Sequence, residues 1–149
     1  MLTKGEPMAE ANPWKERNER VIEEYRETGG TVSGSLAGRP LLLLTTTGAK
    51  SGKPFTTPLN YSTDGERLVL IASRGGTPRH PDWYHNLVAN PEVTIEQDAE
   101  KFQARAATAQ EPDRTRLFDQ QVAIMPFFDD YRKQVTAREI PVVVLERIG

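Results

Sequence analysis

The chain has 149 residues and no cysteine, and its formal net charge is −2 at pH 7. This length suffices for one domain with a hydrophobic core. The missing cysteines exclude disulfides, thiolate metal sites and a cysteine nucleophile, and the charge balance does not indicate a nucleic-acid-binding protein. No apolar stretch approaches ~18 residues and the N-terminus lacks the apolar segment of a secretory signal. We therefore expect a cytoplasmic protein without a transmembrane helix.

The first thirty residues predict a flexible tail and one helix. Residues 1–12 are polar, Asn12 is a typical helix cap, and Pro13 suits a first helical position. Apolar residues then recur at helical spacing until Gly29-Gly30 ends the pattern. We expect an amphipathic helix over 13–30 that either packs on the rim of the main domain or touches a membrane surface reversibly.

From residue 40 the pattern is that of short strands. Strands are predicted over 41–47, 53–63, 67–73, 93–97, 102–108 and 140–147, and helices over 80–90 and 111–124. Hairpin turns fall at Asp64-Gly65 and around 98–101. Short antiparallel strands with a few inserted helices are typical of a small β-barrel, which we expect to occupy residues 31–149.

The sequence LLLLTTTGAKSGKPFTTP contains a basic turn bracketed by glycines. Gly48 and Gly52 can adopt positive φ and let a ligand approach the backbone. Lys50 and Lys53 can place ammonium groups on phosphate oxygens, and Ser51 can add a hydroxyl. The spacing does not match a P-loop. The turn therefore predicts either a phosphate site or an ordinary solvated hairpin.

Two further loops carry polar and aromatic groups. The run from Ser73 to Gly76 offers a hydroxyl, a cation and backbone amides at the expected mouth of the barrel. In HPDWYHN, Trp83 and Tyr84 could wall a planar ring, or Trp83 could anchor the core. His80 and His85 are poorly spaced for a shared metal, and there is no GxSxG motif. We expect no metal, and a cationic, aromatic-walled cleft for a cofactor that carries its own chemistry.

Three separated blocks, LLLLTTTGAKSGKPFTTPL, IASRGGTPRHPDWYHNLVANPEV and IPVVVLE, resemble the deazaflavin-dependent nitroreductase and quinone reductase family of actinobacteria. The resemblance covers residues 35–147. It implies a mainly β fold, a split β-barrel like that of the FMN-binding oxidoreductases. It also implies hydride transfer from reduced coenzyme F420 to a quinone or nitro compound. An FMN-dependent split-barrel reductase and a non-catalytic carrier of F420 or a lipid stay open as alternatives.

The resemblance further implies roles for individual residues. Ser73 and Tyr131 are candidates for hydrogen-bonding the acceptor oxygen. The acceptor side falls on Met125, Phe128 and Tyr131, where the drug-activating member has three tyrosines, so one hydroxyl remains here. The cofactor side falls on four segments, with candidates Ala49, Lys50, Ser51, Lys53, Phe55, Thr56, Thr57, Pro58, Leu59, Asn60, Ile71, Ala72, Ser73, Arg74, Asp82, Trp83, Tyr84, His85 and Asn86.

Overall fold

The computed structural model describes residues 14–148, so the predictions for residues 1–12 and for Asn12 and Pro13 lie outside it. Its helices are α1 (Lys15–Thr28), α2 (Asp82–Ala89), α3 (Asp113–Ile124) and α4 (Phe127–Gln134), with two 3₁₀ turns, η1 (Gly34–Leu36) and η2 (Arg74–Gly76). Its strands are β2 (Leu41–Thr47), β3 (Pro54–Asn60), β4 (Ser62–Asp64), β5 (Arg67–Ile71), β6 (Glu92–Gln97), β7 (Glu100–Thr108) and β8 (Val142–Ile148).

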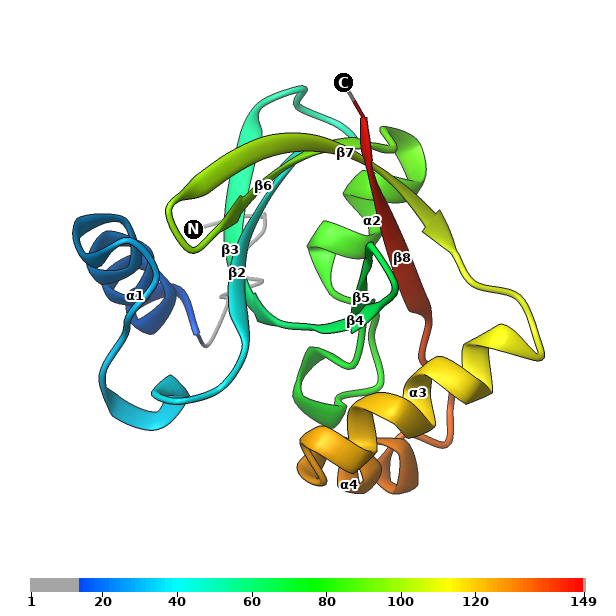
Figure 1. Cartoon of the computed structure of the whole chain (residues 1–149). Coiled ribbons are helices and arrows are strands. Elements are labelled where there is room, and N and C mark those ends of the chain that lie inside the picture. The colour runs from blue at the N-terminus through cyan, green and yellow to red at the C-terminus, as the bar shows by residue number, and fades with distance from the viewer. Residues whose placement is uncertain (1–13, 149) are drawn as a thin grey trace, which may run out of the picture.

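The strands form one antiparallel sheet of seven strands in the order β3-β2-β6-β7-β8-β5-β4. The predicted single strand over 53–63 is wrong, because it is divided at Tyr61. β3 pairs with β2, and β4 pairs with β5 at the opposite edge of the sheet. Since only Tyr61 separates these two edge strands, the sheet must curl until its edges approach each other. Figure 1 shows this curled half-barrel, which has the predicted mainly β fold.

Neighbouring residues of the central strands point to opposite sides of the sheet, and both sides are covered. In β2, Leu42 and Leu44 belong to the barrel interior, whereas Leu41 and Leu43 pack with α1. The apolar run in β8 is also buried on both sides. Val143 faces the barrel interior, whereas Val142 and Val144 pack with the cluster formed by α3 and α4. Burial on both faces explains why these strands are continuous apolar runs without alternation.

Helix α1 is tied to the barrel by Tyr25, whose side chain is 1% exposed. The Tyr25 hydroxyl donates to the Leu41 carbonyl at 3.0 Å and accepts from the Asp98 amide at 2.6 Å. Gly29 ends the helix in the left-handed region, with φ 74°. The residues of α1 that are fully exposed are polar or charged, so its apolar stripe is used in packing on the barrel rim.

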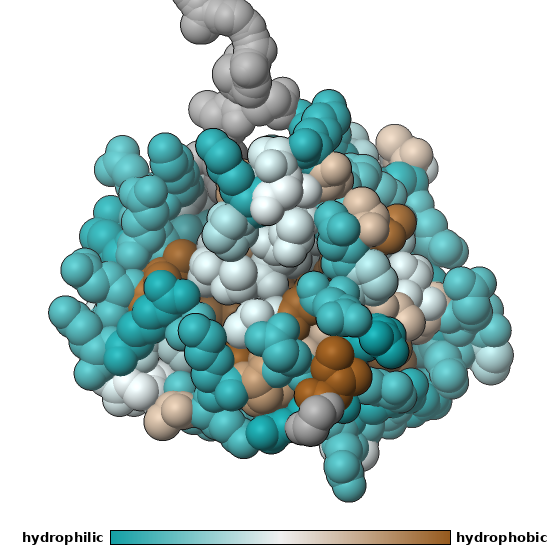
Figure 2. Space-filling view, turned by 90° about the horizontal axis from the view of Figure 1, so that it is seen from above, coloured by the Kyte–Doolittle hydropathy of each residue, from teal (hydrophilic) through white to brown (hydrophobic). Residues whose placement is uncertain are grey.

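Helices α3 and α4 cover the side of the sheet opposite the barrel interior (Figure 1). The predicted helix over 111–124 begins at Asp113, and α4 was not predicted at all. Within residues 14–148, no helix is long and apolar enough to cross a bilayer. The face seen in Figure 2 is mainly hydrophilic, with small, separate apolar patches.

Candidate functional site

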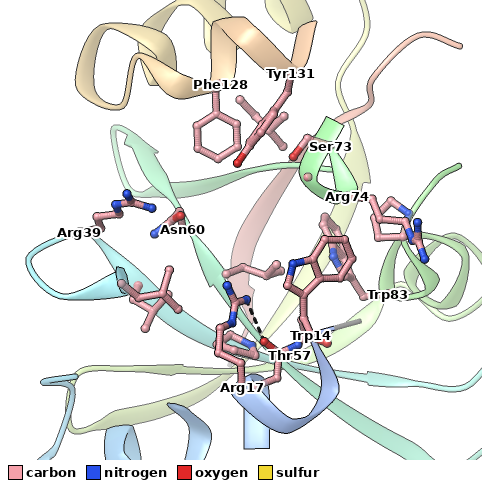
Figure 3. Close-up of a pocket in the computed structure, with 18 of the residues that line it drawn as sticks. Trp14, Arg17, Arg39, Thr57, Asn60, Ser73, Arg74, Trp83, Phe128 and Tyr131 are labelled. Atoms are coloured by element: carbon pink, nitrogen blue, oxygen red, sulfur yellow. Dashed lines mark hydrogen bonds between the residues drawn. The ribbon is translucent and has the colours of Figure 1, made fainter. Parts of the chain in front are cut away.

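A cavity of about 240 Å³ lies where the start of α1, strand β3, the end of β5, the start of α2 and helix α4 meet (Figure 3). Its walls combine aromatic rings with arginine side chains. The lining residues are Trp14, Arg17, Asn18, Leu36, Arg39, Leu41, Thr57, Pro58, Leu59, Asn60, Ile71, Ser73, Arg74, Gly75, Arg79, Pro81, Asp82, Trp83, Phe127, Phe128 and Tyr131.

Aromatic side chains from three helices form much of the wall. Trp83, on α2, is 7% exposed and belongs to the barrel core while it also lines the cavity. The two interpretations of Trp83 as cleft wall and as core anchor therefore both describe it. On α4, Tyr131 packs edge-on against Phe128, with the ring centroids 5.4 Å apart. On the α1 side, Trp14 lies under the guanidinium of Arg74 at 5.5 Å.

The loop from Ser73 to Gly76 passes between α1 and α4 in a conformation that needs its glycines. Arg74, Gly75 and Gly76 all have positive φ, at 48°, 63° and 80°. A Cβ on Gly75 would lie 3.0 Å from Trp14, and one on Gly76 would lie 3.0 Å from Tyr131. The backbone of Ser73 is in the right-handed helical region and that of Arg74 in the left-handed region. This succession turns consecutive amides towards one point and makes an anion-binding concavity.

A side chain that the sequence did not single out holds this loop. Arg138 donates to the carbonyls of Ala72, Ser73 and Thr77 at 3.2, 2.9 and 3.0 Å. Its Nη1 also lies 2.9 Å from Nδ1 of His80. Because a guanidinium can only donate, His80 accepts through Nδ1 and is neutral. Burial, then the nearby Arg138 charge, lowers the pKa of His80. Burial likewise lowers the pKa of Arg138.

The basic turn lies beside the cavity, at the other end of α2. The Ala49 amide donates to Oδ1 of Asn86 at 3.0 Å, and Nδ2 of Asn86 donates to Thr46 at 3.2 Å. Asn86 is one helical turn beyond Asp82, which lines the cavity. Lys50 and Lys53 are exposed. The turn and the cavity therefore both contact α2, about one helical turn apart.

Its two glycines are needed for different reasons. Gly52 has the predicted positive φ, at 72°. The same prediction for Gly48 is wrong, because Gly48 is absent from the positive-φ positions of residues 14–148. Gly48 is instead required for space, since a Cβ there would lie 2.6 Å from Oγ of Ser51 and 2.8 Å from the ring of Phe55.

The structure separates the predicted site residues into two groups. Those that line the cavity are Thr57, Pro58, Leu59, Asn60, Ile71, Ser73, Arg74, Asp82, Trp83, Phe128 and Tyr131. Those outside its lining are Ala49, Lys50, Ser51, Lys53, Phe55, Thr56, Ala72, Tyr84, His85, Asn86 and Met125. In the second group, Ala72 and Met125 are buried in the core, at 0% and 4% exposure. The Tyr84 hydroxyl is hydrogen-bonded to Thr108.

Sequence reasoning missed the α1 side of the cavity. Trp14 and Arg17 are three residues apart and so share one helix face. The sequence pattern indicated only a charged helix with one apolar packing stripe, and nothing in it assigned this helix to the site. Arg39 and Phe127 also line the cavity, with the guanidinium 4.5 Å from the ring centroid. These two residues are far apart in the chain and meet only in the folded protein, so no local sequence motif could reveal their contact.

Comparison with known proteins identifies the family of the chain. The family model of the F420H(2)-dependent quinone reductases matches residues 17–147. An F420H(2)-dependent quinone reductase of Mycobacterium tuberculosis strain H37Rv is 44% identical over 128 residues, which is 83% of this chain and 85% of the relative. These matches confirm the predicted resemblance, the oxidoreductase class and F420, in place of FMN, as the cofactor of the family.

Solved structures give the same answer for the fold. The F420H2-dependent reductase FDR-A aligns with a TM-score of 0.67 and 35% identity, over 72% of this chain and 95% of that one. A domain-swapped dimer aligns with a TM-score of 0.68 and 33% identity, over 89% and 96%. The heme storage protein HutZ of Vibrio cholerae, at 17% identity, a TM-score of 0.56 and 88% and 90% coverage, shares the fold alone. The predicted split barrel is confirmed, and the chain belongs to the F420H(2)-dependent quinone reductase family.

Proposed function

We propose that this chain reduces a quinone with reduced F420, and that both are held on the surface running from the basic turn to the cavity. The observation that carries the proposal is the hydrogen bond from Ala49 to Asn86, which holds the basic turn one helical turn from an aromatic, arginine-lined cavity. Family membership supplies the identity of the cofactor.

The residues present fit a long anionic cofactor with a planar ring. In residues 14–148, the amides of Lys50 and Ser51 have no hydrogen-bond partner, and neither lysine of the turn forms an ion pair. These donors suit a phosphate and an acidic tail. Pro58 and Leu59 of the cavity lining offer apolar contact to a ring, and the loop 73–75 offers its amides to a polar ring edge. Reduced F420, when bound, supplies the hydride.

The acceptor end of the cavity is the side facing α4. Figure 3 shows the hydroxyls of Ser73 and Tyr131 pointing into the cavity. Either hydroxyl can donate to a quinone oxygen and hold the ring in place. A quinone becomes a hydroquinone by gaining one hydride and one proton, and we assign the proton to Tyr131, Ser73 or a cavity water. Nitro compounds, which need the same polarisation of an oxygen, are a second acceptor class.

The proposal is tested by one titration followed by turnover. Binding of F420 and of FMN is measured by fluorescence quenching, and we expect F420 to bind at least about tenfold more tightly, a difference of roughly 1.4 kcal/mol. Oxidation of reduced F420 is then followed with menadione as acceptor. Equal affinity for FMN would support an FMN-dependent reductase, whereas F420 binding without any turnover would support a carrier.

Contact of the N-terminal helix with a membrane stays a prediction. The part of the helix that the structure describes gives it little support, because Val21 and Tyr25 pack on the barrel and the fully exposed residues are polar or charged. Co-sedimentation with neutral and with anionic vesicles measures the contact directly, and binding to neither kind would remove it.

We also propose that residues 31–149 form the cofactor-binding domain, to which α1 adds one wall of the cavity. The basic turn, the loop around Ser73 and all the strands fall within this range. Trp14 and Arg17 do not. The division therefore assigns F420 binding mainly to the barrel and part of the acceptor site to the helix.

A further inference from the structure

The cavity carries more positive charge than the proposed cofactor explains. Among residues 14–148, its lining contains four arginines and one carboxylate, Asp82. Arg74 and Arg79 belong to the stretch after β5 that faces the proposed cofactor. Arg17 stands on α1, on the wall opposite α4, and Arg39 stands just before β2, over the Phe127 ring of α4. These two cations have no role in the function proposed above.

Arg17 is held in the cavity without an anion. Its Nε is buried and makes no hydrogen bond to residues 14–148, and one Nη donates to Oδ1 of Asn18 at 2.9 Å. Burial lowers the pKa of Arg17, and the neighbouring Tyr131 opposes part of that shift. Figure 3 shows the guanidinium entering the cavity from the side opposite Tyr131. A cation withdrawn from water is stabilised when an anion pairs with it.

Arg39 extends this positive surface. Its guanidinium lies over the Phe127 ring at 4.5 Å, and Figure 3 shows it beside Asn60 at the cavity edge. Neither Arg17 nor Arg39 forms an ion pair with any carboxylate in the described part of the chain. Asn60 also lines the cavity, and its Nδ2 donates to the Pro40 carbonyl at 3.0 Å. Within residues 14–148, the unpaired guanidinium donors available to an anionic group are therefore those of Arg17 and Arg39.

We propose that Arg17, with Arg39 adding positive charge from another wall of the same cavity, forms a subsite for an acidic substituent of the acceptor, so that the protein prefers anionic quinones to neutral ones. This inference rests on the function proposed above. A sulfonated naphthoquinone is the probe, because it keeps the ring system of menadione and carries a permanent negative charge. The guanidinium pairs with the sulfonate while the quinone oxygen stays within reach of the α4 side.

Direct binding tests the subsite without turnover. Trp14 and Trp83 are the chain's two tryptophans and both line the cavity, so intrinsic fluorescence reports its occupancy. We expect the sulfonated quinone to bind roughly 10- to 100-fold more tightly than menadione at low salt. Added salt should weaken the binding of the sulfonated quinone and leave menadione unchanged. The full chain is titrated with and without saturating F420.

Variants assign the preference to Arg17. Arg17→Gln should abolish most of the preference, Arg17→Lys should keep part of it, and the control Arg20→Gln, an exposed arginine on the same helix, should keep all of it. Equal binding of the two quinones by the wild type, or a preference without salt dependence, would overturn the subsite. So would an Arg17→Gln variant that loses F420 affinity but not the preference. Absence of menadione reduction with the preference intact would instead refute the proposed function alone.

Discussion

The guanidinium of Arg138 donates to the carbonyl oxygen of Ser73, at 2.9 Å, across 65 positions of the chain. The same guanidinium binds the carbonyls of Ala72 and Thr77, so one side chain fixes both ends of the loop. Because the carbonyls of this loop turn towards Arg138, Ser73 is presented to the cavity from a rigid support. Arg138 acts through this loop and is a positioning residue.

Replacing Arg138 with Met should therefore affect turnover more than cofactor binding. Loss of the donor leaves buried carbonyls without a partner, which costs about 1–3 kcal/mol of unfolding free energy. A displaced loop should lower kcat by about 10- to 100-fold, while the dissociation constant of F420 changes little, because the basic turn is untouched. Steady-state kinetics and F420 titration measure the two effects. Arg147→Met, on an exposed arginine, is the control, and a loss confined to F420 affinity would contradict the positioning role.

The neutral state of His80 predicts a pH dependence of stability. Its pKa in the folded protein is lowered from 6.5 by burial and by Arg138, so the unfolded chain takes up the proton at higher pH. The contribution to stability is thus fully present above pH 6.5 and is lost as the pH falls below 6.5 through the lower pKa of His80 in the folded protein. Chemical denaturation at pH 7 and pH 5 should show this loss in the wild type and a smaller one in His80→Asn. His85→Asn removes only the smallest of the three causes that lower the pKa of His80, so it should keep most of the loss. An equal loss in the wild type and in His80→Asn would remove His80 as the cause.

Neutralising Lys50 tests whether the turn holds the cofactor's phosphate. A charge-assisted hydrogen bond contributes about 1.5–3 kcal/mol, so Lys50→Ala should raise the dissociation constant of F420 by roughly 10- to 150-fold. The rate of hydride transfer at saturation should change less. Because Lys50 is exposed, the effect should shrink as salt is added. Lys101→Ala, at an exposed position in β7, is the control; unchanged F420 binding by Lys50→Ala at low salt would mean that the turn is only a hairpin.

Trp83 should be needed for both stability and binding. Since it is 7% exposed and packed in the barrel core, Trp83→Ala should lose about 3–5 kcal/mol of unfolding free energy. Trp83→Phe keeps an aromatic wall, and we expect it to fold and to bind F420 more weakly than the wild type. Thermal melts and titration of the folded fraction separate the two effects. Val88→Ala, at an exposed position of α2, should alter neither, and full F420 affinity in a folded Trp83→Ala protein would exclude Trp83 from the site.

The sequence predicted those elements whose local pattern is unambiguous. Strand β2 has the bounds expected for 41–47, because seven consecutive apolar and threonine residues fit only a buried strand. The break at Tyr61 could not be predicted, since no glycine marks it and the chain stays extended on both sides. What ends β3 is long-range: Asn60 pairs with Leu41, at the start of β2, and Ser62 with Val69 of another strand.

The same distinction applies to the site. The loop after β5 and the start of α2 were recognisable, because glycines, a cation and aromatic residues lie together in the chain. Arg17 and Arg138 were not, because neither belongs to a motif: Arg17 enters the cavity from α1, and Arg138 reaches the loop across 61 to 65 positions of the chain. Met125 was assigned to the acceptor side by analogy, yet its helix boundary turns it into the core. A motif locates a loop, whereas side-chain direction depends on how the helices pack.

The direction in which each side chain at the start of α4 points decides which substitution can change the acceptors that the protein reduces. Phe128 and Met125 are equally buried in one core cluster, at 5% and 4% exposure, but only Phe128, with Tyr131, lines the cavity. Phe128→Tyr should therefore add a usable hydroxyl. One hydrogen bond contributes about 0.5–1.5 kcal/mol, so reduction of a bulky bicyclic nitroimidazole should rise by roughly 2- to 10-fold in kcat/KM.

The matched change Met125→Tyr should gain no activity and should lose about 1–3 kcal/mol of stability through overpacking. Menadione turnover and F420 affinity should stay nearly constant in Phe128→Tyr, because a flat quinone already has the hydroxyls of Ser73 and Tyr131 within the cavity. Parallel assays of both acceptors with the two variants measure this. A wild-type protein that reduces the nitroimidazole as fast as menadione would contradict the argument, since its cavity would already supply the polar contacts that Phe128 lacks.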